Sequence, residues 1–345
     1  MKQRIAFLSA CLALLWLLQC LLCPKYMCDN KEGALIGEYY ANAGNNDVIF
    51  IGDCEVYENF SPITLWEEYG ITSYIRGSPQ QTIWQSYYLL EEIFRYETPK
   101  VVVFNVLSMK YDTPASTGNQ SRREAYNRMT LDGMRWSSSK VKAILASMTE
   151  EEREWESLLT YLFPIFRYHS RWSQLTQEDF TYLFRRDTVG IQGYLMQTGV
   201  KPAGDAYTEP PLADYAFGEN GFDYLDKIAG LCKSHGTQLL LIKAPSLSPV
   251  WWPEWDAQMV RYGQVHGIPY INLLSHQAEI GIDWNTDTYD AGLHLNVSGA
   301  EKAARWLGRI LSEEYLVPDH RDDAEISRLW AEKASFYNTQ KQYKE

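Results

Sequence analysis

The sequence predicts a three-layer α/β protein with a parallel sheet and a central helical insertion. An N-terminal transmembrane helix is expected to precede this domain. Three observations predict this class. Apolar strand-like runs alternate with helical patterns in two blocks, residues 110–220 between the blocks lack convincing strands, and an uncharged apolar run opens the chain. Strands that alternate with helices are typical of right-handed βαβ crossovers and therefore of parallel sheets.

The apolar run extends from Ile5 to Cys23 and follows Lys2 and Arg4. A helix rising about 1.5 Å per residue over this run is long enough to cross a hydrocarbon core. The preceding positive charges predict a cytoplasmic amino terminus and an extracytoplasmic main domain. A cleaved signal peptide is the alternative, although no small-x-small cleavage site follows convincingly. Residues 1–24 are thus expected to be a membrane anchor or signal segment, and residues 25–46 a polar stalk.

The α/β domain is expected over residues 47–317, with the helical insertion at about 110–220 over one edge of the sheet, where substrate-shaping lids often lie. The tail, residues 318–345, is charged and is expected to form a surface helix. Continuous or β-branched apolar runs predict strands over residues 47–52, 71–77, 100–106, 237–245 and 268–273. Helical spacing of apolar residues predicts helices over residues 80–96, 221–236, 254–267 and 296–315.

Charge and cysteine content exclude several classes of function. A formal net charge of -12 argues against nucleic-acid binding, which needs clustered Lys and Arg. Outside the apolar run only Cys28, Cys54 and Cys232 remain, and an odd number cannot form a complete disulfide framework, so at least one is a free thiol in a monomer. Their spacing fits no zinc motif and no Cys-x-x-Cys redox motif. No metal and no cofactor is expected.

A candidate nucleophile follows the first strand, in the turn that contains Gly52, Asp53 and Cys54. Ligands bind beyond the carboxyl ends of strands in open parallel sheets, so Cys54 is expected at the active-site edge. His294, with Asp290 four residues earlier, precedes the last helix and should reach the same edge. In this arrangement His294 takes the proton from Cys54, while Asp290 orients the imidazole and stabilises its charged form. Asp53 is expected to hold the turn through backbone hydrogen bonds.

The turn "IGDC" and the stretch "YDAGLHLNVSGAEK" resemble the first and last motifs of the GDSL/SGNH hydrolase superfamily. With the apolar amino terminus, the chain is similar to membrane-anchored proteins related to the D-alanine transfer protein of teichoic acid modification and to alginate O-acetylation proteins. The resemblance implies a flavodoxin-like sheet and ester chemistry on a cell-envelope glycopolymer. It also implies, as a partner, a multi-pass membrane O-acyltransferase that hands over the acyl group.

Position by position, the resemblance places Cys54 at the family's serine and His294 at its general base. Asp290 stands one residue further from the histidine than the family's Asp-x-x-His spacing. Gly77 matches the block that supplies an oxyanion-hole N–H, and Asn105 stands in for the asparagine of the third block, without the surrounding Gly-x-Asn-Asp pattern.

The cysteine leaves three interpretations open: an active esterase or O-acyltransferase, an enzyme impaired by the substitution, and an inactive polymer-binding or scaffold protein. A thiolate is the stronger nucleophile, whereas the neighbouring Glu55 opposes its formation if the carboxylate is near.

Three further residues are substrate-binding candidates. Trp251 and Trp252 follow a strand end, where indoles can stack on a sugar, and core packing is the alternative. Lys243 ends the same strand, where it either meets an anionic group or extends along the surface. His169 lies among aromatic residues and two arginines, which suits contact with an anionic polymer, but packing within a helix is the favoured interpretation.

Overall fold

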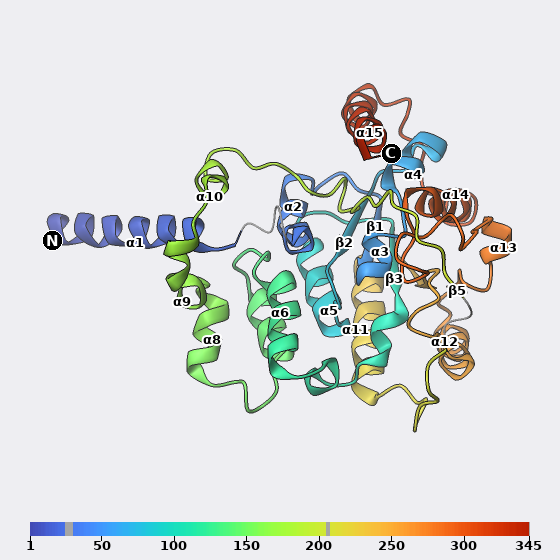
Figure 1. The fold of residues 1–345 in the computed structure, drawn as a ribbon, viewed down its shortest axis with the longest axis horizontal. Helices are drawn as coiled ribbons and strands as arrows, with labels where there is room; N and C mark the ends of the chain where they lie inside the picture. The colour runs from blue at the N-terminus through green and yellow to red at the C-terminus, as the bar shows by residue number, and fades with distance from the viewer. Residues whose placement is uncertain (25–29, 205–207, 345) are drawn as a thin grey trace.

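The computed structural model describes residues 1–24, 30–204 and 208–344 and contains one five-stranded sheet in which every strand pair is parallel (Figure 1). The strand order is β2-β1-β3-β4-β5, which confirms the predicted α/β class. The strands are β1 (Val48–Gly52), β2 (Ser73–Gly77), β3 (Val101–Asn105), β4 (Gln238–Lys243) and β5 (Tyr270–Asn272). Each lies within a predicted strand and is shorter than predicted.

The sheet is buried on both faces, as the continuous apolar runs predict. Along β1, Val48 and Phe50 belong to one core cluster, and the alternating Ile49 and Ile51 belong to a second cluster on the opposite face. Side chains of successive strand residues point to opposite faces, so a strand apolar at every position needs cover on both sides.

Helices supply that cover and complete three layers. On the face of Ile49, the core includes side chains from α5 (Ile83–Ile93), α11 (Glu219–Ser234) and α12 (Pro253–His266). On the face of Val48, it includes side chains from α3 (Cys54–Tyr57), α4 (Pro62–Tyr69) and α14 (Val297–Glu313). A short helix, α13 (Gln277–Ile280), precedes α14. The closing helix lies within the predicted range 296–315 and begins at Val297, where the Asn296 side chain caps it by accepting from the Gly299 N–H.

The insertion between β3 and β4 is helical and lies beyond the β2 edge of the sheet (Figure 1). It then returns along β2, where the Ile75 N–H donates to the Gln192 carbonyl. Its α-helices are α6 (Gln120–Leu131), α7 (Ser138–Ala146), α8 (Trp155–Leu162), α9 (Ile165–Tyr168) and α10 (Gln177–Thr181). Shorter 3₁₀ turns are η3 (Val106–Lys110), η4 (Pro114–Thr117) and η5 (His169–Gln174).

The first helix, α1 (Lys2–Leu22), is long and apolar enough to cross a membrane and projects from the body. The stalk expected over residues 25–46 is wrong for residues 30–46, which fold onto the domain as η1 (Lys31–Ala34), α2 (Leu35–Glu38) and η2 (Tyr39–Ala41). Leu35, Ile36 and Tyr39 are buried there, because they find apolar partners on the sheet and the insertion. Residues 25–29, with Cys28, lie outside the described residues.

The carboxyl-terminal segment also packs more closely than a charged tail. Helix α15 (Ala324–Lys344) buries Trp330, which stacks on Trp66 of α4 with ring centroids 5.3 Å apart. The Tyr337 hydroxyl, likewise buried, donates to Glu301 of α14 at 2.6 Å. The expected surface helix therefore adds two large rings to the core.

Candidate active site

The turn after β1 presents Cys54 at the carboxyl end of the sheet. A side chain at Gly52 would lie 3.0 Å from the Asn105 Cβ, so glycine is needed where β1 and β3 approach each other closely. Asp53 caps α3 by accepting from the Glu55 N–H at 3.3 Å, which confirms the structural role expected for Asp53. Cys54 is the first residue of α3 and is half-buried.

The structure brings Cys54 and His294 together: their side chains are hydrogen-bonded, although they are far apart in the sequence. Asp290 completes the arrangement, since its Oδ2 lies 2.7 Å from His294 Nδ1. Its Oδ1 also accepts from the His294 backbone N–H at 2.8 Å. Ala291 and Gly292 both have positive φ, and this tight loop lets an aspartate at the longer spacing reach the ring.

A second carboxylate, which the sequence analysis missed, meets the same nitrogen. Glu58 Oε2 lies 3.1 Å from His294 Nδ1 and accepts from the Tyr289 hydroxyl at 2.8 Å. The Tyr289 ring stacks on the imidazole with an interplanar angle of 16°. The only signal in the sequence is the spacing of one helical turn between Cys54 and Glu58, which puts both on one face of a helix.

Asn59, the next residue, connects the segment after β1 with the loop that carries His294 and with the segment after β4. Its Nδ2 donates to the Pro245 carbonyl at 2.9 Å, and its Oδ1 accepts from the Leu295 N–H at 2.8 Å. The side chain is fully buried, so each of these hydrogen bonds replaces one with water. Asn59 thereby holds the histidine loop against the segment that follows β1.

The return segment of the insertion covers the outer side of the histidine loop. The Lys201 N–H donates to the Thr288 carbonyl at 2.9 Å, and the Ala291 N–H donates to the Lys201 carbonyl at 3.0 Å. Asn296 Nδ2 donates to the Gly199 carbonyl at 3.0 Å. The insertion therefore shapes the surroundings of His294 through residues 199–201.

Burial and the two carboxylates set the charges of the site. Burial raises the pKa of the Cys54 thiol, and His294 offsets this effect only in part. Burial alone would lower the pKa of His294, but Cys54, Asp290 and Glu58 together raise it to about 12. Burial also raises the pKa of Glu58, to about 7. The neighbouring negative charges therefore favour the imidazolium form of His294, whereas burial disfavours the thiolate form of Cys54.

Two predicted site residues support the turn instead of facing a ligand. Lys243 is fully buried and pairs with Glu55 at 2.9 Å, which corrects its assignment as a substrate-binding residue. Asn105 donates from Nδ2 to Asp53 at 3.1 Å and to Glu55 at 2.9 Å, so both amide hydrogens are engaged and neither is available to an oxyanion. Ser246 also hydrogen-bonds Glu55. The charge of Glu55 is thus neutralised beneath the turn.

The remaining candidates lie around the same edge of the sheet. Gly77 ends β2 in register with Gly52, and a side chain there would approach the Gly52 carbonyl to 3.1 Å. Trp251 is buried, donates to Asp256 at 3.0 Å and packs beside Phe217, so core packing and not sugar contact explains it. Trp252 is half-buried and packs edge-on against Tyr215 at 5.3 Å.

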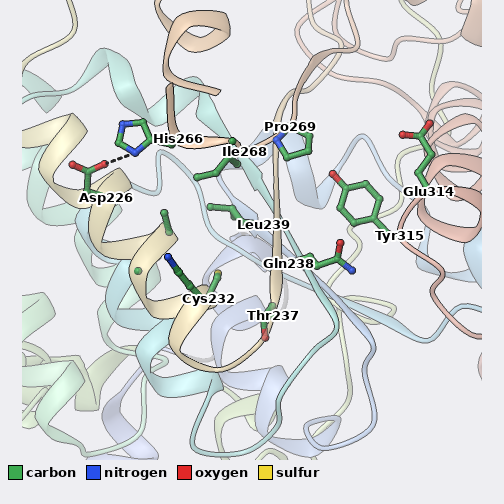
Figure 2. A pocket seen from close by; sticks show the side chains of 14 residues that line it. Asp226, Cys232, Thr237, Gln238, Leu239, His266, Ile268, Pro269, Glu314 and Tyr315 are labelled. Atoms are coloured by element: carbon green, nitrogen blue, oxygen red, sulfur yellow. Dashed lines mark ion pairs between the residues drawn. The ribbon is translucent and has the colours of Figure 1, made fainter. Parts of the chain in front are cut away.

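A cavity of about 770 Å³ lies away from this chemistry (Figure 2). Thr237, Gln238 and Leu239 line it at the beginning of β4, so it opens at the amino end of the sheet, whereas Cys54 follows the carboxyl end of β1. Its charged or ionisable neighbours include Lys233, Glu314, and the pair Asp226 and His266, which lie 3.8 Å apart. Cys232 also lines this cavity, and like Cys54 it is a free thiol, as the odd cysteine count predicts.

Within residues 1–24, 30–204 and 208–344, no group of three or more His, Cys, Asp or Glu side chains is arranged to hold a metal ion. No protein-family model and no curated protein sequence matches the chain. Among solved structures, the fold is similar to a "putative acylhydrolase" from Bacteroides fragilis, with a TM-score of 0.40 and 12% identity, over 81% of this chain and 95% of that one. A likeness of this size assigns neither a family nor an activity to this chain.

Proposed function

We propose that the protein transfers acyl groups from esters, with Cys54 as nucleophile, His294 as general acid and base, and Asp290 as the orienting carboxylate. The observation that carries the proposal is the continuous chain of hydrogen bonds from Asp290 through His294 to Cys54 at the carboxyl edge of the sheet. Nucleophile, base and orienting acid within hydrogen-bond reach form the arrangement that covalent acyl transfer requires.

In the reactive form Cys54 is a thiolate and His294 an imidazolium. Because the carboxylates occupy Nδ1, the Nε2 nitrogen is the one left to face the sulfur. The thiolate attacks the ester carbonyl and forms a tetrahedral intermediate. When this collapses, the ester C–O bond breaks, the leaving alcohol takes the Nε2 proton, and the acyl group remains on Cys54 as a thioester.

The second half of the reaction cleaves the thioester and restores the thiolate of Cys54 and the imidazolium of His294. A water molecule or an acceptor hydroxyl gives its proton to Nε2 and attacks the thioester carbonyl, and the thiolate of Cys54 leaves. Water gives hydrolysis, and a sugar hydroxyl gives transfer. As the first residue of α3, Cys54 has a backbone N–H without a partner inside the helix, and this N–H and that of Gly77 are the proposed oxyanion donors.

The proposed substrate is an O-acylated cell-envelope glycopolymer outside the cytoplasm. The apolar helix α1 supports a place at the membrane, and the motifs around Cys54 and His294 support ester chemistry. A multi-pass membrane O-acyltransferase is the proposed acyl donor in the transfer version. Trp252, half-buried at the edge of the sheet, remains the proposed sugar contact.

Hydrolysis of a chromogenic acetyl ester by the purified full chain tests the proposal. Cys54→Ala and His294→Ala should each lower kcat/KM by about 100-fold or more. Cys232→Ala is the matched control, because it removes a buried free thiol remote from the site. Equal activity in the parent, Cys54→Ala and His294→Ala would refute the assignment.

One observation favours a second candidate function, a polymer-binding protein that retains the site without turnover. Burial raises the pKa of Cys54 and so disfavours the nucleophilic thiolate at neutral pH. A binding protein should show no ester hydrolysis and unchanged polymer affinity in Cys54→Ala. A gain of activity in Cys54→Ser would identify an enzyme impaired by its cysteine.

A further inference from the structure

Large apolar side chains are exposed along one stretch of the insertion, from α8 to just beyond α10. Trp155 of α8 is 68% exposed, Trp172 of η5 is 71% exposed, and Phe184, just beyond α10, is 91% exposed. The surfaces of soluble monomeric proteins rarely expose this many large apolar side chains on neighbouring elements. A surface that does so is typically a contact site for a protein or a membrane. We call this set the α8–α10 surface; its members are Trp155, Phe163, Phe166, Trp172, Phe180 and Phe184.

The α8–α10 surface lies at the point where α1 meets the body. Helices α8, α9 and α10 form the side of the domain from which α1 projects (Figure 1). Arg171 of η5 fixes the junction, since it donates to the Leu22 carbonyl at 3.0 Å and pairs with Asp179 of α10 at 2.8 Å. Leu22 is buried there, whereas Leu12 and Leu14 in the middle of α1 are exposed.

This geometry fixes the depth of the surface relative to a bilayer. If α1 spans the hydrocarbon core, the boundary of the core lies near Leu22, where the helix ends. The helices packed against that end then lie at the level of the lipid headgroups. Tryptophan with neighbouring arginine is typical of this level, and Arg167 of α9 and Arg185, just beyond α10, have exposed side chains.

We infer that the α8–α10 surface inserts its aromatic side chains into the lipid headgroup layer beside α1, so that the domain rests on the membrane and does not hang from a stalk. Of the stalk expected over residues 25–46, residues 30–46 are folded onto the domain. The inference rests on α1 spanning a membrane and is independent of the chemistry of Cys54.

The test uses the full chain in phosphatidylcholine nanodiscs prepared with or without acyl chains brominated near the headgroup or deeper. Bromine quenches tryptophan fluorescence at short range, and subtracting the spectrum of a Trp→Phe variant isolates one residue among the 12 Trp. Trp172→Phe should remove emission that shallow bromine quenches. Trp16→Phe, within α1, should remove emission that deeper bromine quenches. Trp306→Phe, on α14 away from α1, should remove only unquenched emission.

Quenching of Trp16 without quenching of Trp172 would overturn the inference and would point to a protein partner for the α8–α10 surface. Absence of quenching at both positions would show that α1 does not enter the bilayer, and this too would overturn the inference. Ester hydrolysis, measured on the same samples, reports separately on the proposed function.

Discussion

Glu58 Oε2 lies 3.1 Å from His294 Nδ1, so the imidazole has a second carboxylate beside Asp290. Two negative charges at one nitrogen stabilise the imidazolium more than one does. Glu58 is a positioning residue, because it acts on the proposed reaction through His294.

Glu58→Gln should lower the pKa of His294, since it removes one of the charges that hold this pKa at about 12. We expect kcat/KM to fall by about tenfold, less than in Asp290→Asn, because Asp290 still orients the ring. The rising limb of the pH profile of kcat/KM, which reports ionisation of Cys54, should move to lower pH, because burial and the charge of Glu58 both raise the pKa of Cys54 and the variant removes the second cause. A change in thermal stability without movement of this limb would indicate a purely structural role. Glu68→Gln, at an exposed ion pair with Arg305, is the matched control.

A second prediction concerns the stability of the site. Burial raises the pKa of Glu58 to about 7, against a value of about 4.3 in an unfolded chain. Between these values the native state retains a proton that the unfolded chain has released, so the free energy of unfolding falls as pH rises through this window. The fall should amount to about 4 kcal/mol or less and should be absent in Glu58→Gln. Urea unfolding of the full chain in detergent at several pH values measures the free energy of unfolding. An equal decline with pH in the parent and in Glu58→Gln would show that Glu58 is not the group responsible.

A third prediction concerns the reactivity of the sulfur. Because burial raises the pKa of Cys54, alkylation by iodoacetamide should be slow at neutral pH and should accelerate above about pH 8.5, the pKa of an ordinary thiol. Ester hydrolysis should rise over the same range. Mass spectrometry of the peptide that carries Cys54 gives the rate, with Cys54→Ala as the blank. Rapid alkylation at pH 6 would show an ion pair already formed and would contradict the prediction.

The fold and the meeting of Cys54 with His294 could be predicted because both follow from strand patterns. Apolar runs at β1 and β4 identify buried parallel strands, and all carboxyl ends of such strands meet at one edge. The role of Lys243 could not be predicted in this way. At a strand end, the side chain can point to solvent or beneath the neighbouring turn, and the buried carboxylate of Glu55 decides between the two.

The packing of residues 30–46 against the domain, and the two buried rings of α15, could not be predicted for a related reason. Both segments are polar on average, and local composition favours an exposed position. Their burial depends on a few apolar side chains, such as Leu35 and Trp330, that fit into gaps left by elements distant in sequence. Contacts of this kind have no local signature, and neither does the approach of Glu58 to His294.

A fourth prediction tests the buried pair beneath the turn. Lys243→Met leaves the Glu55 carboxylate buried without its cation and should lower the free energy of unfolding by about 3–5 kcal/mol. The double variant Glu55→Gln/Lys243→Met should recover most of this loss, because no uncompensated charge remains. Arg305→Met, at an exposed pair with Glu68, should cost about 1 kcal/mol or less. Equal losses in Lys243→Met and Arg305→Met would show that Lys243 is not buried.

The last prediction concerns the docking of α15. Trp330 is 2% exposed and stacks on Trp66, so Trp330→Ala should remove a buried ring and lower the free energy of unfolding by about 3–5 kcal/mol. Phe336→Ala on the same helix is the matched control, because Phe336 is 45% exposed and its removal leaves no cavity. Guanidinium unfolding of the full chain, followed by tryptophan emission, measures both. If the two variants lose equal stability, α15 is not anchored through Trp330. If only Trp330→Ala is destabilised, and this variant hydrolyses the ester normally at guanidinium concentrations at which it is still folded, α15 stabilises the fold and contributes nothing to the active site.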